Sequence, residues 1–315
     1  MKRCAEKWNT VLFGGFLAVF ALCGILRPDK AFSEMENRTL QQKPTFSAET
    51  MLDGTYAQQT ESHLADQFVF RDESVALKTA LDALSGKREF NGVCLADGRL
   101  IERVDAPDEA QLTANIQAVR QLGEGLKVPV TLELIPTAAE IYKDTLPKGF
   151  PTADQTALLA RIYAESSVKT VDVQAALHQH RDEYIFYCTD HHWTSRGAYY
   201  GAAALLQSMD QTLPPLDSYT PERVTTDFNG TLFSSSGVRT VQPDAIDWYV
   251  PQGTAQVQSW RTGKAEESQL YDRSYLAKKD KYASFLGGNQ PLAVIKTGNP
   301  GEKILLVRDS YADCL

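Results

Sequence analysis

The chain has 315 residues, of which 43% are hydrophobic and 10% aromatic, so it can bury one large core or two smaller ones and is not disordered. Its formal net charge is −8, and because the first 27 residues are basic, the remaining body is more acidic than the chain as a whole. An acidic body argues against binding of nucleic acid through phosphate contacts.

The N-terminus combines positive charge with an apolar run. Lys2, Arg3 and Lys7 precede residues 8–26, which carry no charge. About 20 apolar residues can span a bilayer, and a basic flank stays in the cytoplasm. We therefore predict a signal-anchor transmembrane helix in residues 1–27, a single pass through the cell membrane and an extracytoplasmic body. Secretion after signal-peptide cleavage is the alternative, although no small-residue cleavage site follows the apolar run.

The body begins with a polar linker at residues 28–46, and hydrophobic periodicity then predicts an alternation of helices and strands. The expected helices lie at 47–56, 72–86, 108–122, 153–166, 172–181 and 195–209, and the expected strands at 91–102 (a hairpin), 128–135, 168–173, 184–187 and 304–307. Such alternation indicates an α/β fold with a mostly parallel sheet between helices. Residues 211–292 break the pattern with several prolines and short β-like runs, which indicates a β-rich insertion.

Two polar clusters follow predicted strands, at the sheet edge where α/β proteins bind ligands. One is the TDHHWT segment at residues 189–194, and the other contains Ser310. A serine nucleophile requires a base and a carboxylate that orients the base. Ser310, Asp190 and either His191 or His192 offer this set, and spacing does not decide between the histidines. The alternative is structural: a helix cap at Ser310 and a capped turn around a partly buried tryptophan.

A metal site is a competing interpretation of the same histidines. Asp190, His191 and His192 are possible ligands, and His178 and His180 are near in sequence. However, adjacent histidines rarely face one ion, residues two apart do not share a helix face, and no HExxH motif or cysteine pair is present. We therefore expect neither a metal nor another cofactor.

Gly288 and Asn289 are candidates for an oxyanion or substrate-binding site. Glycine lets the backbone approach a ligand closely, and an asparagine side chain can donate a hydrogen bond to a developing oxyanion. The alternative is an ordinary turn.

Several short motifs occur in a specific order along the chain. They lie at residues 33–38, 66–72, 189–194, 227–232, 285–289 and 309–312. In this order they resemble the DHHW family of exported bacterial proteins, which is related to the alginate O-acetylation proteins and to the SGNH hydrolase superfamily. The resemblance implies a flavodoxin-like (SGNH-type) fold. It also implies an acetyltransfer motif of the form Asp-x-His-Trp, in which Asp190 is the orienting acid, His192 the base and Ser310 the nucleophile.

The function implied by the resemblance is a serine-dependent O-acyl (acetyl) transferase or esterase that acts on cell-envelope polysaccharide outside the cytoplasm. A membrane-bound O-acyltransferase often supplies the acetyl group in such systems. The alternative is a non-catalytic carbohydrate-binding or assembly protein of an exopolysaccharide acetylation system.

The sequence departs from the family pattern at its C-terminus. Arg308 stands where relatives commonly have a small residue, and only five residues follow Ser310. We expect no helix to form in residues 311–315 and therefore a truncated SGNH-like domain at residues 47–315.

Overall fold

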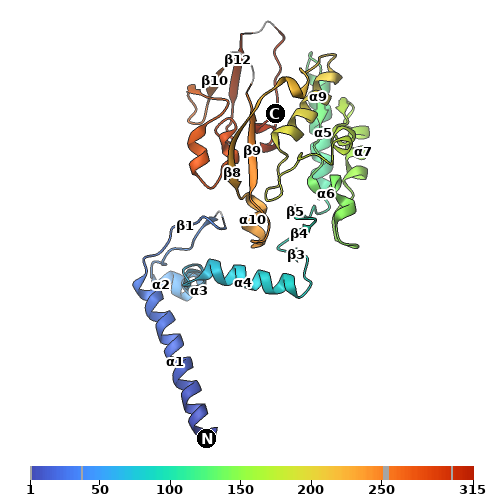
Figure 1. The fold of residues 1–315 in the computed structure, drawn as a ribbon. Coiled ribbons are helices and arrows are strands. Elements are labelled where there is room, and N and C mark those ends of the chain that lie inside the picture. Colours follow the sequence, from blue (N-terminus) through green and yellow to red (C-terminus); the bar gives the residue numbers. More distant parts are fainter. Residues whose placement is uncertain (1, 37, 251–254, 299–300) are drawn as a thin grey trace. The chain divides into compact units, whose positions relative to one another are not determined.

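The computed structural model describes residues 2–36, 38–250, 255–298 and 301–315 and divides the chain into two compact units, Met1–Gly86 and Lys87–Leu315. The ribbon in Figure 1 follows the chain from blue to red through both units. The helices between residues 48 and 84 belong to the first unit, whereas the sequence predicts an α/β domain that begins at residue 47.

The first unit is helical apart from one short hairpin. Its elements are α1 (Lys2–Leu26), β1 (Phe32–Ser33), β2 (Arg38–Thr39), α2 (Ala48–Leu52), α3 (Thr55–Asp66) and α4 (Arg71–Leu84). The predicted N-terminal helix is thus present as α1. Within the described residues, however, none of the helices meets the length and hydropathy needed to cross a membrane, so the predicted transmembrane helix is not confirmed.

Two of the sequence motifs meet in the first unit through ion pairs. The Arg38 guanidinium donates to both carboxylate oxygens of Asp66, at 2.9 Å and 2.5 Å, and also to Glu36 at 2.7 Å. Arg71 pairs with the same Glu36 carboxylate. Through these pairs the motifs at 33–38 and 66–72 fix β2 to the end of α3 and the beginning of α4.

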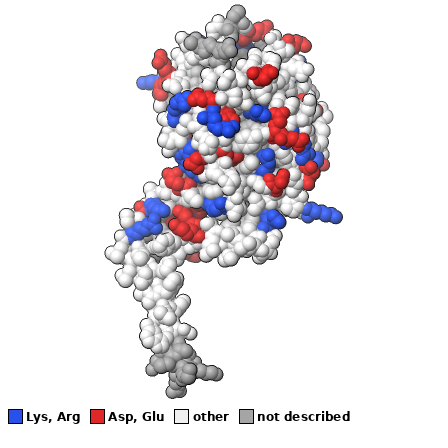
Figure 2. All heavy atoms as spheres, viewed as in Figure 1, with Lys and Arg blue, Asp and Glu red and all other residues white. Residues whose placement is uncertain are grey.

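The second unit carries the remaining elements. They are β3 (Glu89–Phe90), β4 (Val93–Ala96), β5 (Arg99–Glu102), α5 (Glu109–Gly125), β6 (Thr131–Glu133), α6 (Ala138–Ile141), η1 (Lys143–Thr145), α7 (Gln155–Ser166), β7 (Lys169–Val171), α8 (Val173–Gln179), α9 (Ser195–Ser208), η2 (Leu216–Ser218), β8 (Pro221–Phe228), α10 (Thr231–Ser236), β9 (Asp244–Tyr249), β10 (Ala255–Ser259), β11 (Glu266–Ser268), η3 (Arg273–Ala277), η4 (Tyr282–Ser284), β12 (Ala293–Thr297) and η5 (Ser310–Asp313). Figure 2 shows basic and acidic side chains interspersed over the visible face of this unit.

The sheets of the second unit are small and mixed, so a flavodoxin-like sheet is not confirmed. β6 and β7 pair in parallel, as the predicted β–α–β pattern requires. The other sheets are antiparallel: β3–β4–β5, β8–β9 and β11–β10–β12. Residues 211–292 contain β8 to β11 and are β-rich.

Two predicted strands do not join a sheet. Residues 184–187 instead fold back on the loop that follows them: Thr194 N–H donates to Ile185 O at 2.9 Å, and Phe186 and Trp193 form an isolated bridge. Residues 304–307 carry no strand, and Leu305 and Val307 are 82% and 84% exposed. Their apolar side chains match a strand pattern, but their backbone has no partner strand in the described structure, and a strand needs one.

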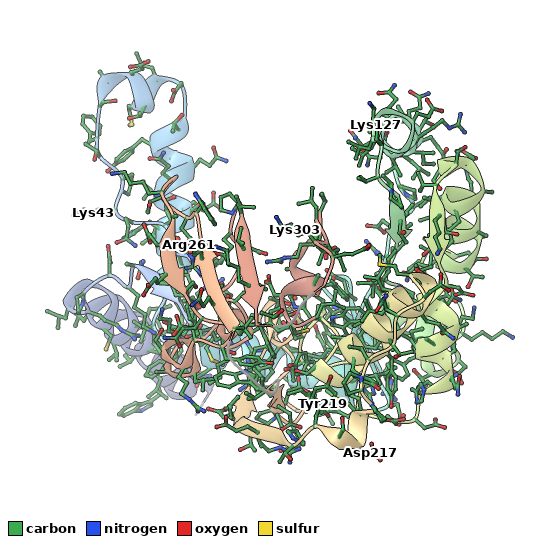
Figure 3. All side chains as sticks on the ribbon, turned by 90° about the horizontal axis from the view of Figure 1, so that it is seen from above. Lys43, Lys127, Asp217, Tyr219, Arg261 and Lys303 are labelled. Atoms are coloured by element: carbon green, nitrogen blue, oxygen red, sulfur yellow. The ribbon has the colours of Figure 1, made fainter. Side chains whose placement is uncertain are left out.

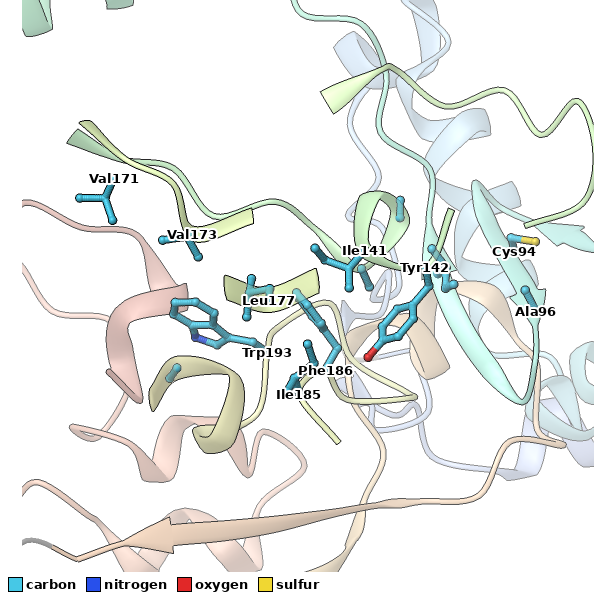
Figure 4. Packing of buried hydrophobic residues seen from close by; sticks show 14 of the residues in the cluster. Cys94, Ala96, Ile141, Tyr142, Val171, Val173, Leu177, Ile185, Phe186 and Trp193 are labelled. Carbon is cyan, nitrogen blue, oxygen red and sulfur yellow. The ribbon is translucent and has the colours of Figure 1, made fainter. Parts of the chain in front are cut away.

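Two hydrophobic clusters meet around the TDHHWT segment. One, shown in Figure 4, packs Trp193 with Val173, Leu177, Ile185 and other side chains of the α/β part. The second is aromatic and draws on the β-rich part; it contains Tyr187, Phe228, Ile246, Trp248, Tyr282 and Phe285. Cys314 packs against both clusters. The segment is therefore held between the α/β part and the β-rich part.

Candidate active site

The segment at 189–194 is positioned by the beginning of α9. Thr194 is the N-cap of this helix, and its hydroxyl accepts from Gly197 N–H at 3.3 Å. Trp193 is fully buried against the helix, where a Cβ on Gly201 would lie 2.6 Å from its ring. A Cβ on Gly197 would lie 2.3 Å from Ile185 O. The two glycines therefore permit the close approach of α9 to the segment.

A buried carboxylate from β9 holds the beginning of the segment. Asp244 accepts from the backbone N–H of Cys188 at 2.8 Å and of Thr189 at 2.7 Å, and from the Thr189 hydroxyl at 2.5 Å. Burial raises the pKa of Asp244, and these hydrogen bonds oppose the shift. Thr189 Oγ1 in turn accepts from Gly230 N–H at 3.0 Å, which fixes α10 beside the segment.

Asp190 and His192 form a buried pair. His192 Nδ1 lies 2.6 Å from Asp190 Oδ1, and the same oxygen accepts from His192 N–H at 3.0 Å. The other oxygen, Oδ2, accepts from the backbone N–H of Thr231 at 2.8 Å and from its hydroxyl at 3.1 Å. Burial by itself would raise the pKa of Asp190, but the His192 and Thr231 hydrogen bonds hold it well below its usual range. The carboxylate is therefore ionised and oriented at neutral pH.

Ser310 completes a line of three side chains. Its Oγ lies 2.8 Å from His192 Nε2, although the two residues are 118 positions apart in the chain. When the imidazole donates Nδ1–H to Asp190, Nε2 is the acceptor for the serine hydroxyl. This is the arrangement by which a serine hydroxyl is activated as a nucleophile.

The turn that carries Ser310 is tied to the TDHHWT segment. Trp193 Nε1 donates to Tyr311 O at 2.7 Å, and the Tyr311 hydroxyl donates to His191 O. Tyr311 N–H donates to the Asp309 carboxylate at 3.0 Å, which caps the short helix η5. Residues 310–313 form this 3₁₀ turn, and the described residues 311–315 contain no α-helix.

His191 lies beside the line of three and not in it. Its Nδ1 is 2.7 Å from Thr231 Oγ1, and burial lowers its pKa while Asp190 opposes the shift. Asp190, His191 and His192 place possible ligand atoms within 4.8 Å of one another, and this group includes neither His178 nor His180. The Asp190 oxygens and both His192 nitrogens are engaged in the hydrogen bonds described above. The geometry therefore favours the nucleophile arrangement over metal ligation.

The structure places the Gly288–Asn289 candidate in a tight turn. Gly288 N–H donates to Phe285 O at 2.9 Å, and its φ of +84° favours glycine. The Arg261 side chain, labelled in Figure 3, donates to Leu286 O at 3.4 Å on the same turn. The Gly288 amide is thus engaged within the turn, which favours the ordinary-turn interpretation of this glycine. The Asn289 side chain is exposed, and its role stays a prediction.

The sequence did not indicate the role of Asp244 or the hydrogen bonds by which Thr231 holds Asp190. Thr231 belongs to the motif at 227–232, so the motif marked the segment but not the contact. Asp244 lies in no motif, and its partners Cys188 and Thr189 are more than 50 positions away. No signal in a single sequence points to such a contact.

The chain is similar to proteins of known family and known structure. A family model described as DHHW protein matches residues 108–315. The crystal structure of a DHHW family protein from Eubacterium siraeum is 27% identical, with a TM-score of 0.60 over 72% of this chain and 78% of that one. PatB1 of Bacillus cereus is 18% identical, with a TM-score of 0.56 over 70% of this chain and 81% of that one, and shows similarity of fold.

A curated relative is also similar in sequence. The probable alginate O-acetylase AlgJ of Pseudomonas syringae pv. tomato is 26% identical over 182 residues. The match covers 54% of this chain and 46% of that protein, so the chain spans about half the length of the relative it matches.

Proposed function

Because the chain belongs to the DHHW family, we propose that it is a serine-dependent O-acyl, in particular O-acetyl, transferase or esterase that acts on cell-envelope polysaccharide outside the cytoplasm. The similarity to an alginate O-acetylase supports the substrate class. The observation that carries the proposal is the hydrogen-bonded line from Asp190 through His192 to Ser310, with distances of 2.6 Å and 2.8 Å.

In the proposed reaction Ser310 Oγ attacks the carbonyl carbon of an acyl ester while His192 Nε2 takes the hydroxyl proton. Asp190 accepts a hydrogen bond from Nδ1–H, stays ionised and stabilises the imidazolium that forms. The ester C–O bond then breaks, and His192 gives the proton to the departing alkoxide, which leaves an acyl group on Ser310. A sugar hydroxyl or water next loses its proton to His192 and attacks the acyl carbon. The bond between this carbon and Ser310 Oγ then breaks, and His192 returns the proton to Oγ.

The acyl donor and the oxyanion site are part of the proposal. A membrane-bound O-acyltransferase is the proposed source of the acyl group. Asn289 remains the proposed side-chain donor to the oxyanion, since its exposed amide is available to a ligand.

The rival proposal is a non-catalytic carbohydrate-binding or assembly protein. Such a protein has no need of a buried carboxylate, an imidazole and a hydroxyl aligned within hydrogen-bond distance. The alignment around Ser310 therefore favours the enzyme.

Release of p-nitrophenol from its acetate ester tests the proposal. Ser310→Ala and His192→Ala are expected to lower kcat by at least about a thousandfold, because either change removes the nucleophile or its base. Ser235→Ala is the matched control, since Ser235 is exposed on α10 and is expected to keep full activity. Equal activity of Ser310→Ala and the unaltered chain would rule the mechanism out, and transfer of acetyl to an added oligosaccharide separates transferase from esterase.

A further inference from the structure

We propose that Tyr282 is a positioning residue that holds His192 and Ser310 in register for acyl transfer. The inference rests on the proposed function and adds to it a residue from the β-rich part of the chain, far in sequence from the TDHHWT segment. Tyr282 contacts both partners of the proton transfer, one through its ring and the other through its hydroxyl.

The Tyr282 ring is itself held firmly. The residue begins the short helix η4 and is only 5% exposed. Its ring packs at 5.3 Å from the Phe285 ring and edge-on, at 6.3 Å, against the Tyr187 ring. On the chain side, Asp272 N–H donates to Ser284 O at 2.7 Å, which ties η4 to the segment before η3. Because these contacts restrain the Tyr282 side chain, Tyr282 can in turn restrain the groups that it contacts.

The first contact is between rings. The Tyr282 ring stacks on the His192 imidazole with a centroid distance of 3.9 Å and an interplanar angle of 11°. The hydrogen bond between Nδ1 and Asp190 and the one that Nε2 accepts from Ser310 hold the edge of the imidazole, whereas the Tyr282 ring packs on its face. A ring stacked on this face opposes tilting of the imidazole, and it also favours the imidazolium that forms during the reaction.

The second contact is a hydrogen bond to the nucleophile's backbone. The Tyr282 hydroxyl donates to Ser310 O at 3.0 Å, with Tyr311 O at 3.3 Å as a second acceptor. The Tyr282 side chain therefore restrains both the plane of the His192 imidazole and the position of the turn that carries Ser310. The distance between Nε2 and Oγ depends on both, and small displacements in a reacting pair cost large factors in rate.

Two substitutions separate the contacts in the p-nitrophenyl acetate assay. Tyr282→Phe keeps the ring and loses the hydrogen bond, so we expect kcat to fall about threefold to tenfold. Tyr282→Leu loses both, and we expect kcat to fall about tenfold to a hundredfold. KM should stay within about twofold in both variants, because the contacts align the reacting groups rather than bind substrate.

Tyr271→Leu is the matched control. Tyr271 packs on the same aromatic cluster and stacks on Trp248 at 4.8 Å, and its hydroxyl donates to Tyr249 O at 2.9 Å. The Tyr271→Leu substitution removes a similar ring that does not contact Asp190, His192 or Ser310. It should therefore lower Tm and leave kcat nearly unchanged. The NMR chemical shift of the His192 ring protons gives a measurement that does not depend on activity. The Tyr282 ring current should displace this shift in the unaltered chain, and the ring that remains in Tyr282→Phe should do the same. The displacement should be absent in Tyr282→Leu.

The outcomes separate this inference from the proposed function. If Ser310 is essential but Tyr282→Leu keeps the kcat of Tyr271→Leu, Tyr282 has only a packing role and the inference is wrong while the function stands. If Tyr282→Leu does not fold, an unchanged kcat in Tyr282→Phe overturns the hydrogen-bonding role. If the unaltered chain shows no turnover and a sulfonyl fluoride does not label Ser310, the proposed function fails and the inference with it.

Discussion

At the residue scale, the structure strongly fixes the protonation state of Asp190, the acid of the three aligned side chains. Asp190 is buried, yet four hydrogen bonds keep its pKa well below the usual range. Its charge is therefore constant across the physiological range, and its contribution to folding is lost only as the pH falls below the ordinary value for an aspartate, about 3.9.

Asp190→Asn should keep the geometry and lose the orienting charge. We expect kcat for ester hydrolysis to fall about a thousandfold to ten-thousandfold, because an amide favours the wrong imidazole tautomer and does not stabilise the imidazolium. Asp227→Asn, on the exposed end of β8, is the control and should match the unaltered chain. A loss smaller than about tenfold in Asp190→Asn would contradict the role given to this carboxylate.

The partly buried carboxylate of Glu133, outside the aligned three, makes stability depend on pH. Burial raises the pKa of Glu133 on β6 to about 7, and its Oε1 is buried without a partner in the described structure. Because the folded pKa exceeds the unfolded value of about 4.3, ionisation opposes folding, and stability falls as the pH rises from about 4.5 to 7. Glu133→Gln should therefore have the higher Tm at pH 8 and a smaller advantage at pH 5. Parallel Tm curves for the two proteins between pH 5 and 8 would count against this account.

Much of the candidate site, but not all of it, could be predicted from the residue types in the sequence. Asp190 and Ser310 were candidates because polar residues after apolar runs mark strand ends, even though neither 184–187 nor 304–307 became a strand of a sheet. The choice of His192 over His191 came from the resemblance alone, and the geometry agrees with it. Tyr282 could not be predicted, since its contact with His192 depends on how the β-rich part packs.

At the scale of elements, local patterns predicted local structure well. The hairpin at 91–102 became β4 and β5 with its turn at Asp97 and Gly98, and the helices predicted from residue 108 to residue 209 match α5, α7, α8 and α9 within a few residues. Periodicity and caps decide these elements within a few turns of chain. Sheet order depends instead on contacts between distant residues, and there the expectation of one mostly parallel sheet exceeded what the β6–β7 pair supports.

The approach of α9 to the candidate site should be sensitive to a single methyl group. Gly201→Ala places a Cβ 2.6 Å from the Trp193 ring, so the ring must shift and its hydrogen bond to Tyr311 O should weaken. We expect a loss of about 1–3 kcal/mol in the free energy of unfolding from overpacking, together with reduced kcat. Gly125→Ala, at the end of α5 where nothing lies within 4 Å, is the control and should be neutral or slightly stabilising. Urea unfolding of both variants measures the difference, and equal midpoints would refute the steric argument.

At the scale of the whole molecule, the chain consists of two compact units with a boundary at Gly86–Lys87. Residues 84–88 around this boundary are exposed, and Lys87 and Arg88 are sites for trypsin. Exposed segments between compact units are the preferred sites of proteolytic cleavage.

Limited digestion should therefore release a fragment that begins at residue 88 or 89 before the second unit is degraded. Mass spectrometry of early time points identifies the cleaved bond, and replacing both Lys87 and Arg88 with Gln should delay the fragment. Earlier cleavage within residues 89–250 would show that the boundary is not the most accessible point of the chain.

The exposed apolar run at Ile304–Val307 has a consequence for how the chain behaves at high concentration. These four apolar residues, of which Ile304 and Val307 are β-branched, have no partner strand among the described residues and form a template to which a second molecule can add a strand. The net charge of −8 repels a second copy of the chain and opposes this association. This repulsion weakens as ions screen it. Salt should therefore promote self-association of this chain, and dilute, low-salt buffer should keep it dispersed.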